Sequence, residues 1–184
     1  MALQMQIIGE KGSFLFANIY SPQRLEDKIL LLRHLTSLHH RYSTSQAIYG
    51  GDFNMITSLE EKKGGTRALS NDARAFNAFI QEVNLVDIRP RNGLFTWTNR
   101  QGGDKLIASR LDHFVVSESL LLEGNIMSSE IIPSGGSNHW PISLQVSISS
   151  TPKNRPFRFE RFWLTHKDFL RNIKTWWKVP LPVE

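Results

Sequence analysis

The hydrophobic positions of this chain follow two spacings, one typical of strands and one typical of helices. Short apolar runs at 4–10, 13–20 and 46–49 have the length and composition of strands. The first two flank Lys11-Gly12, which predicts a β-hairpin. Positions 25–38 instead carry leucine or isoleucine every three or four residues, which predicts a helix packed on a sheet. The first third of the chain therefore predicts strands joined by a helix.

Capping residues predict where the helices begin. Ser21 is a typical N-cap, and Pro22 suits the first position of the helix that follows. A polar segment at 57–70 reads as a loop, after which Ser70 or Asn71 caps a second helix. Its apolar face recurs at helical spacing, at Phe76, Phe79, Ile80 and Val83.

The second half of the chain is richer in strand-like runs. We expect strands at 94–98 and 108–116, joined by a polar turn, and further strands at 126–132 and 143–148. In the run 108–116, alternation places Arg110, Asp112 and Phe114 on one face. A carboxylate on an inward strand face needs a partner.

The segment Gly50-Gly51-Asp52-Phe53-Asn54 follows the strand at 46–49. Paired glycines let the backbone turn tightly, and a carboxylate and an amide two residues apart can hold a water and a phosphate oxygen. Asp and Asn at a strand end also form ordinary turns with their own backbone, so both interpretations stay open here. Asp112 and His139 also lie where strands meet loops, which predicts one pocket where these side chains meet.

Charge divides the chain into two parts. Residues 1–150 hold 14 Lys and Arg against 14 Asp and Glu, whereas residues 151–184 hold 8 against 3. We therefore expect one domain at 1–150 and a basic, aromatic tail at 151–184 with a helix from about 166 to 178. Such a tail can contact phosphates or be an ordinary solvated segment.

Composition excludes several classes of protein. The chain has no cysteine, which excludes a disulfide scaffold, a thiolate zinc site and a cysteine nucleophile. It has no run near the ~20 apolar residues that a membrane helix needs, and its first residues do not read as a signal peptide. These features predict an intracellular protein without a membrane partner.

Three motifs in fixed order resemble the endonuclease/exonuclease/phosphatase superfamily, whose fold is that of deoxyribonuclease I. The resemblance is strongest to the endonuclease domain of plant LINE-type non-LTR retrotransposons, and it covers nearly the whole chain. The motifs are Gly51-Asp52-Phe53-Asn54, Ser109-Arg110-Leu111-Asp112-His113 and Ser137-Asn138-His139-Trp140-Pro141-Ile142, with Phe95-Thr96-Trp97-Thr98-Asn99 and Arg155-Pro156-Phe157-Arg158-Phe159-Glu160 as further matches.

This resemblance implies a fold and an activity. The fold is an α/β sandwich of two mixed β-sheets packed face to face with flanking helices, here without its first strands. The implied activity is hydrolysis of DNA phosphodiesters with Mg²⁺ or Mn²⁺, in the nucleus if the chain acts as a retrotransposon endonuclease. Two alternatives remain: an inactive, truncated remnant with weak nucleic-acid binding, and a phosphoesterase acting on small molecules.

The resemblance also implies roles for single residues. The carboxylate of Asp52 orients the attacking water and contributes to the metal site, and Asn54 holds the water or the phosphate. Asp112 pairs with His139, which acts at the phosphate, and Tyr20 contacts the scissile phosphate or is a strand-end aromatic.

Two departures from the family pattern predict weak or lost activity. Asn138 stands where the family has a carboxylate that helps to bind metal. The Glu that is the family's main metal ligand is expected in strands that precede residue 1. Whether the chain is an active enzyme therefore stays open at this point.

Overall fold

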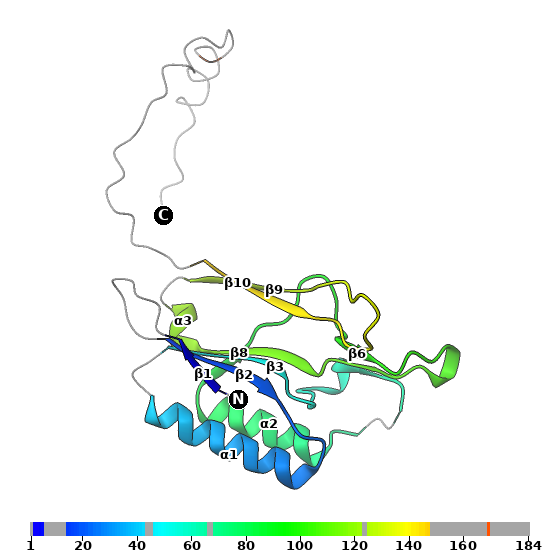
Figure 1. Ribbon diagram of the computed structural model, residues 1–184, viewed down its shortest axis with the longest axis horizontal. Coiled ribbons are helices and arrows are strands. Elements are labelled where there is room, and N and C mark those ends of the chain that lie inside the picture. Colours follow the sequence, from blue (N-terminus) through cyan, green and yellow to red (C-terminus); the bar gives the residue numbers. More distant parts are fainter. Residues whose placement is uncertain are drawn as a thin grey trace, which may run out of the picture. The chain divides into compact units, whose positions relative to one another are not determined.

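The computed structural model describes residues 2–5, 14–42, 46–65, 68–122, 125–147 and 169. The chain divides into two units, Met1–Ser149 and Ser150–Glu184. Figure 1 shows the helices and strands of the first unit, which the following paragraphs describe. Apart from Phe169, the tail predicted at 151–184 lies outside the described residues, so the tail and its helix stay predictions.

A five-stranded mixed sheet organises the first unit. Its strands lie in the order β1 (Ala2–Met5), β2 (Phe14–Tyr20), β3 (Gln46–Asp52), β8 (Asp112–Ser117) and β5 (Leu85–Asp87). β2 and β3 are parallel, whereas β1 with β2, β3 with β8, and β5 with β8 are antiparallel. The antiparallel β1–β2 pair agrees with the predicted hairpin, whereas the predicted turn at Lys11-Gly12 and most of the predicted first strand lie outside the described residues.

Helices connect and cover this sheet. α1 (Leu25–Arg41) joins the parallel strands β2 and β3, as a crossover must. The prediction that it begins at Pro22 was wrong, because the Ser21 N–H is bonded to the Asp52 carbonyl at 2.8 Å and continues the β2–β3 pairing. α2 (Asn71–Glu82) begins as predicted, after Ser70, and a short helix α3 (Glu118–Leu122) follows β8.

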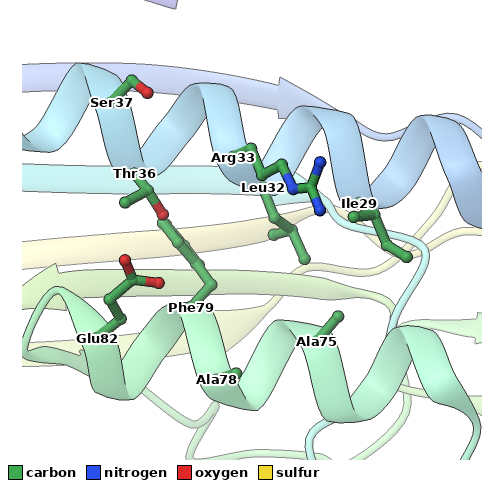
Figure 2. A pocket seen from close by; sticks show the side chains of 9 residues that line it. All are labelled: Ile29, Leu32, Arg33, Thr36, Ser37, Ala75, Ala78, Phe79 and Glu82. Atoms are coloured by element: carbon green, nitrogen blue, oxygen red, sulfur yellow. The ribbon is translucent and has the colours of Figure 1, made fainter.

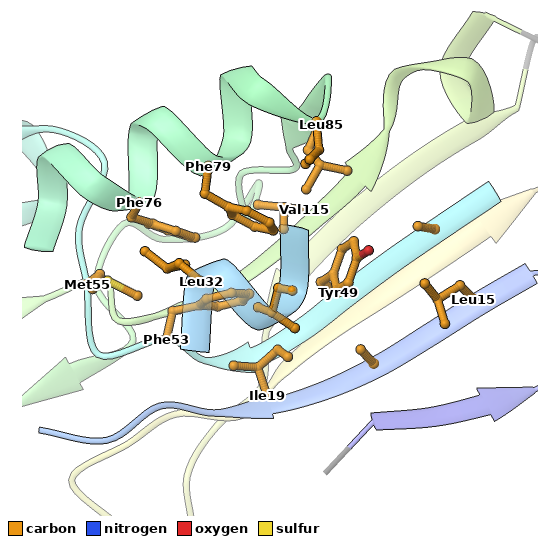
Figure 3. Packing of buried hydrophobic residues seen from close by; sticks show 14 residues of the cluster. Leu15, Ile19, Leu32, Tyr49, Phe53, Met55, Phe76, Phe79, Leu85 and Val115 are labelled. Carbon is orange, nitrogen blue, oxygen red and sulfur yellow. The ribbon is translucent and has the colours of Figure 1, made fainter. Parts of the chain in front are cut away.

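The main core lies between the sheet and helices α1 and α2, which cover the same face (Figures 1 and 3). Phe53 and Phe76 stack with ring centroids 4.7 Å apart, and Phe79 meets Tyr49 edge-on. Burying a side chain of this size stabilises the fold by about 1.5–3 kcal/mol. The predicted apolar face of α2 is therefore confirmed as core.

The opposite face of the sheet is covered by a two-stranded antiparallel sheet, β9 (Ile126–Ile131) with β10 (Ile142–Ser147). Leu144 and Val146 of β10 pack on a second cluster that includes Ile48 and Val116 of the large sheet. A groove of about 640 Å³ remains between these layers. The α/β sandwich with sheets packed face to face is thus confirmed.

The described strands form one more sheet, of β4 (Lys62–Lys63), β7 (Ala108–Ser109) and β6 (Trp97–Thr98). Its strands correct two predictions. The continuous strand predicted at 108–116 is broken, because β7 and β8 belong to different sheets. The loop predicted at 57–70 contains β4 and the 3₁₀ turn η1 (Leu59–Glu61).

Arg110 explains both the break in the predicted strand 108–116 and the ordered segment within the predicted loop 57–70. It is fully buried between β7 and β8, and its guanidinium Nη2 lies 2.8 Å from Oε1 of Glu61, which is also fully buried. Its backbone N–H donates to the Glu61 carbonyl at 2.9 Å. A buried charge requires such a partner, so the pair pins the segment around Glu61 against the break in the strand.

A second hollow, of about 350 Å³, lies between α1 and α2 (Figure 2). Its lining includes Leu32 and Arg33 of α1 and Ala78 and Glu82 of α2. These helices cover the face of the sheet away from β10, so this hollow is separate from the site described next. Within the described residues, no helix has both the length and the apolar character needed to cross a membrane.

Candidate active site

Tyr20, Asp52 and Asp112 form one row across three strands. In the strand register Tyr20 lies opposite Asp52, and Asp52 lies opposite Asp112. Side chains of directly opposed residues point to the same face of a sheet. Side chains alternate between the two faces of a strand, so Ile48 on β3 and Phe114 on β8 lie on the same face as Asp52 and Asp112. This face packs against β10. Of this row, Asp112 lines the groove between the two layers.

His139 reaches this row from the segment before β10. Its backbone forms a bridge with Trp97, and the neighbouring carbonyl of Asn138 accepts the Thr98 N–H at 3.0 Å. Its ring Nδ1 lies 3.1 Å from Oδ2 of Asp112, and its Nε2 lies 4.0 Å from Oδ2 of Asp52. The structure thus brings together three side chains from positions 52, 112 and 139.

Thr96 connects the two sides of this arrangement. Its fully buried hydroxyl accepts the N–H groups of Leu111 and Asp112, each at 3.0 Å. Its carbonyl accepts the Trp140 N–H at 2.8 Å, next to His139. The sequence placed Thr96 in a motif but assigned it no role, because its contacts appear only when distant segments meet.

The segment Asp52–Asn54 forms an ordinary turn and still directs the Asp52 carboxylate into the candidate site. The Asn54 N–H donates to Asp52 Oδ1 at 2.9 Å, as in an ordinary turn in which Asp bonds the backbone two residues on. The Asn54 side-chain amide donates to the Ser21 carbonyl at 2.9 Å and lies 3.4 Å from Asp52 Oδ2. The same carboxylate still faces His139.

Two glycines allow β3 to approach its neighbours at this point. Gly51 has φ +132°, and a Cβ there would lie 2.2 Å from the Ile19 carbonyl oxygen. A Cβ on Gly50 would lie 2.5 Å from the Phe114 ring. A side chain at Gly51 would collide with the backbone of β2, and one at Gly50 would displace the Phe114 ring, so both positions favour glycine.

The charges around Asp52 act in opposite directions. Burial is the largest influence and raises the pKa of Asp52, and the Asp112 carboxylate raises this pKa further. The hydrogen bond from Asn54 and the charges of His139 and Lys28 act against that increase. The site therefore holds a carboxylate that is harder to ionise than an exposed aspartate.

Two predicted site residues lie at the surface. Tyr20 ends β2 beside Asp52 with 80% of its surface exposed, so it can meet a ligand but contributes little to the core. Asn138 is exposed, next to His139. Their functions, like those of the other site residues, stay predictions.

The arrangement can accommodate a divalent cation. One ligand atom each from Asp52, Asp112 and His139 lie within 4.8 Å of one another. Two carboxylates this close repel each other, and a cation between them removes the repulsion. Carboxylate oxygens suit Mg²⁺ and Mn²⁺, and imidazole is a ligand of transition metals. Asp52 was predicted as a ligand, whereas Asp112 and His139 were not.

A family model described as "Endonuclease-reverse transcriptase" matches residues 14–143. The chain belongs to this endonuclease-reverse transcriptase family. A search of curated proteins found no match. The family assignment confirms the resemblance to the endonuclease/exonuclease/phosphatase superfamily, whose members act on DNA and other phosphoesters.

Solved structures share the fold of this chain. The endonuclease domain of TRAS1, a telomere-specific non-LTR retrotransposon, aligns with TM-score 0.59 and 14% identity over 81% of this chain and 64% of that one. The 3'-5' exonuclease NExo from Neisseria meningitidis aligns with TM-score 0.56 and 17% identity over 72% and 60%. An endonuclease/exonuclease/phosphatase family protein from Bacteroides thetaiotaomicron aligns with TM-score 0.54 and 16% identity over 80% and 54%. The chain thus spans less than two thirds of each of these structures.

Proposed function

We propose that this chain is a metal-dependent endonuclease that hydrolyses DNA phosphodiesters. The contact between His139 Nδ1 and Asp112 Oδ2, 3.1 Å long and beside Asp52, carries the proposal. An imidazole oriented by one carboxylate, with a second carboxylate 4.0 Å from its other nitrogen, is suited to proton transfer and charge stabilisation at a phosphate. The family and the TRAS1 endonuclease domain support DNA as the substrate.

Each side chain then has a definite task. Asp112 accepts the Nδ1–H of His139, which fixes the ring so that Nε2 faces the open side of the site. Protonated His139 donates to a phosphoryl oxygen, and the Asp52 carboxylate accepts a proton of the attacking water and orients it. The Asn54 amide exchanges its 3.4 Å contact with Asp52 Oδ2 for a hydrogen bond to the water or phosphate. Tyr20, exposed beside Asp52, contacts the phosphate.

Asp52 and Asp112 would hold Mg²⁺ or Mn²⁺ through carboxylate oxygens, which leaves His139 to donate to the phosphate. The bound ion would stabilise negative charge on the phosphoryl oxygens and on the leaving alkoxide. We expect the activity to be low, because Asn138 replaces a carboxylate of the family and leaves one charge fewer for the cation. As a retrotransposon endonuclease the chain would act in the nucleus.

Nicking of supercoiled plasmid with Mg²⁺ or Mn²⁺ tests this function. Asp52→Asn and His139→Ala are expected to lower the nicking rate about 10²–10⁴-fold, the range typical of a lost general acid or base. Matched controls are Asp27→Asn and His34→Ala on the exposed side of α1, which should nick like the wild type.

Each other outcome contradicts the proposal in a different way. Nicking that persists in the Asp52 and His139 variants would place the activity elsewhere. Hydrolysis of p-nitrophenyl phosphate without nicking would favour a phosphoesterase that acts on small molecules. Inactivity on both substrates with either metal would favour the inactive remnant.

A further inference from the structure

Lys28 is a buried lysine on α1 that shares a face with Leu32 and Leu35. Only 6% of its surface is exposed, and it lies on the face of α1 that meets the sheet. Its Nζ donates to the Asn54 carbonyl at 2.7 Å and to Asp72 Oδ2 at 2.6 Å. An ammonium group removed from water in this way is stable only because both partners accept its hydrogens.

The carbonyl that Lys28 binds belongs to the turn after β3. Asn54 has φ +52°, in the left-handed region, which asparagine adopts more readily than other non-glycine residues. Its side-chain amide donates to Ser21 and lies beside Asp52, so the backbone conformation of Asn54 decides where that amide points. The bond from Lys28 Nζ to the Asn54 carbonyl holds this backbone orientation from outside the turn.

We propose that Lys28 is a positioning residue that fixes the Asn54 carbonyl and thereby keeps the Asp52 carboxylate and the Asn54 amide in the site. This proposal rests on the proposed function, since it assigns a task within the same site. Lys28 acts on the row of Tyr20, Asp52 and Asp112 through the backbone of Asn54, to which its Nζ is bonded.

A purely structural role would work through the other partner. The Lys28–Asp72 ion pair joins α1 to the first turn of α2, and this link alone stabilises the helical layer. Asp72→Asn weakens that link but leaves Lys28 free to bind the Asn54 carbonyl. Lys28→Met removes both contacts, and Lys28→Arg keeps a charged donor. Comparing the three variants separates the two roles.

Amide hydrogen exchange, measured by NMR, reports the stability of the Asp52–Asn54 turn and does not require an active enzyme. The reporters are the N–H groups of Ser21, Phe53 and Asn54, which bond to Asp52, Leu111 and Asp52 respectively. In Lys28→Met we expect their exchange to accelerate about tenfold more than that of interior amides of α1 and α2.

Three controls accompany this measurement. Lys28→Arg should restore protection of the turn, and Asp72→Asn should keep it while lowering the melting temperature. Arg33→Met, on the exposed side of α1, should change neither. If Lys28→Met does not fold, Lys28→Gln, which is shorter and uncharged, takes its place.

The inference is wrong if exchange accelerates equally in the turn and in both helices, or if Asp72→Asn loosens the turn as much as Lys28→Met does. In wild-type protein that nicks, Lys28→Met should lower kcat about tenfold with KM within about twofold, and Lys28→Arg should recover it. A wild type that does not nick counts against the proposed function alone, because the exchange comparison still decides the role of Lys28.

Discussion

Asp52 illustrates how a site residue can oppose the stability of its own fold. Because burial raises its pKa, the folded chain binds this proton more tightly than the unfolded chain does. The corresponding stability is present below the ordinary value of 3.8 and is lost as pH rises through the raised pKa. At neutral pH the ionised carboxylate is therefore a cost to folding.

We accordingly predict that Asp52→Asn raises the melting temperature at pH 7 by a few degrees, while it removes nicking. An asparagine oxygen can still accept the Asn54 N–H, so the turn is kept. At pH 3, where wild-type Asp52 is already neutral, the gain should vanish. Thermal unfolding followed by circular dichroism at both pH values checks this, and an equal gain at both would contradict it.

The sequence predicted the site residues that lie within motifs. It did not predict the residues that hold them in place. Asp52, Asp112 and His139 were predicted to meet, and the structure brings them together. Lys28 was missed because the apolar pattern marks only leucine and isoleucine as buried, although Lys28 shares the face of Leu32 and 41% of Leu25 is exposed. Burial of a lysine is decided by a carbonyl and a carboxylate that lie far away in the chain.

At the scale of elements, a buried network of charged residues lies where the chain passes from β7 to β8. Arg110 donates to Glu61 and to Asp87, and Asp87 lies 3.4 Å from Nδ1 of His113. Burial acts to raise the pKa of Asp87, but His113 and Arg110 outweigh it and hold this pKa below its usual range. The stability that Asp87 contributes is present above its ordinary value and is lost as pH falls through the lowered one.

We predict that Arg110→Met lowers the free energy of unfolding by about 3–5 kcal/mol, because it removes the buried cation at 2.8 Å from Glu61 and leaves only Thr57 and the more distant Arg89 beside that charge. Adding Glu61→Gln to this variant should recover part of the loss. Urea unfolding at pH 7 measures both. A double variant as unstable as the single one would show that the unpaired Glu61 charge is not the cause.

The spacing of apolar residues predicted most helices and strands, because each apolar face packs on one neighbouring layer. It failed at 108–116, where alternation continues through Arg110 although the chain moves from one sheet to another. Alternation cannot reveal such a break, since buried Arg110 looks like a polar strand residue until Glu61 is placed beside it.

At the scale of the whole molecule, the excess positive charge lies in residues 151–184. We propose that this segment is a tail that contacts the DNA backbone while the neutral part, 1–150, supplies the site. Removing one cation that neutralises a phosphate should reduce the slope of log affinity against log salt by about 0.9.

We therefore predict that Lys153→Gln, Arg155→Gln and Arg158→Gln together weaken duplex binding and flatten its salt dependence by up to about 2.7 in slope. Fluorescence anisotropy at several salt concentrations measures this. Lys63→Gln and Lys105→Gln, exposed in the first unit, serve as a comparison for the removal of charge outside the tail. An unchanged slope in the tail variant would show that the segment does not meet phosphates.

The alignment of Tyr20, Asp52 and Asp112 across three strands has a consequence for how the protein is made. Sliding β8 by one residue against β3 would turn Asp112 towards α1 and α2 and part it from His139. A copy still emerging from the ribosome, or one trapped with mispaired strands, thus lacks the means to cut. Competence for the proposed reaction therefore depends on the correct pairing of β3 with β8.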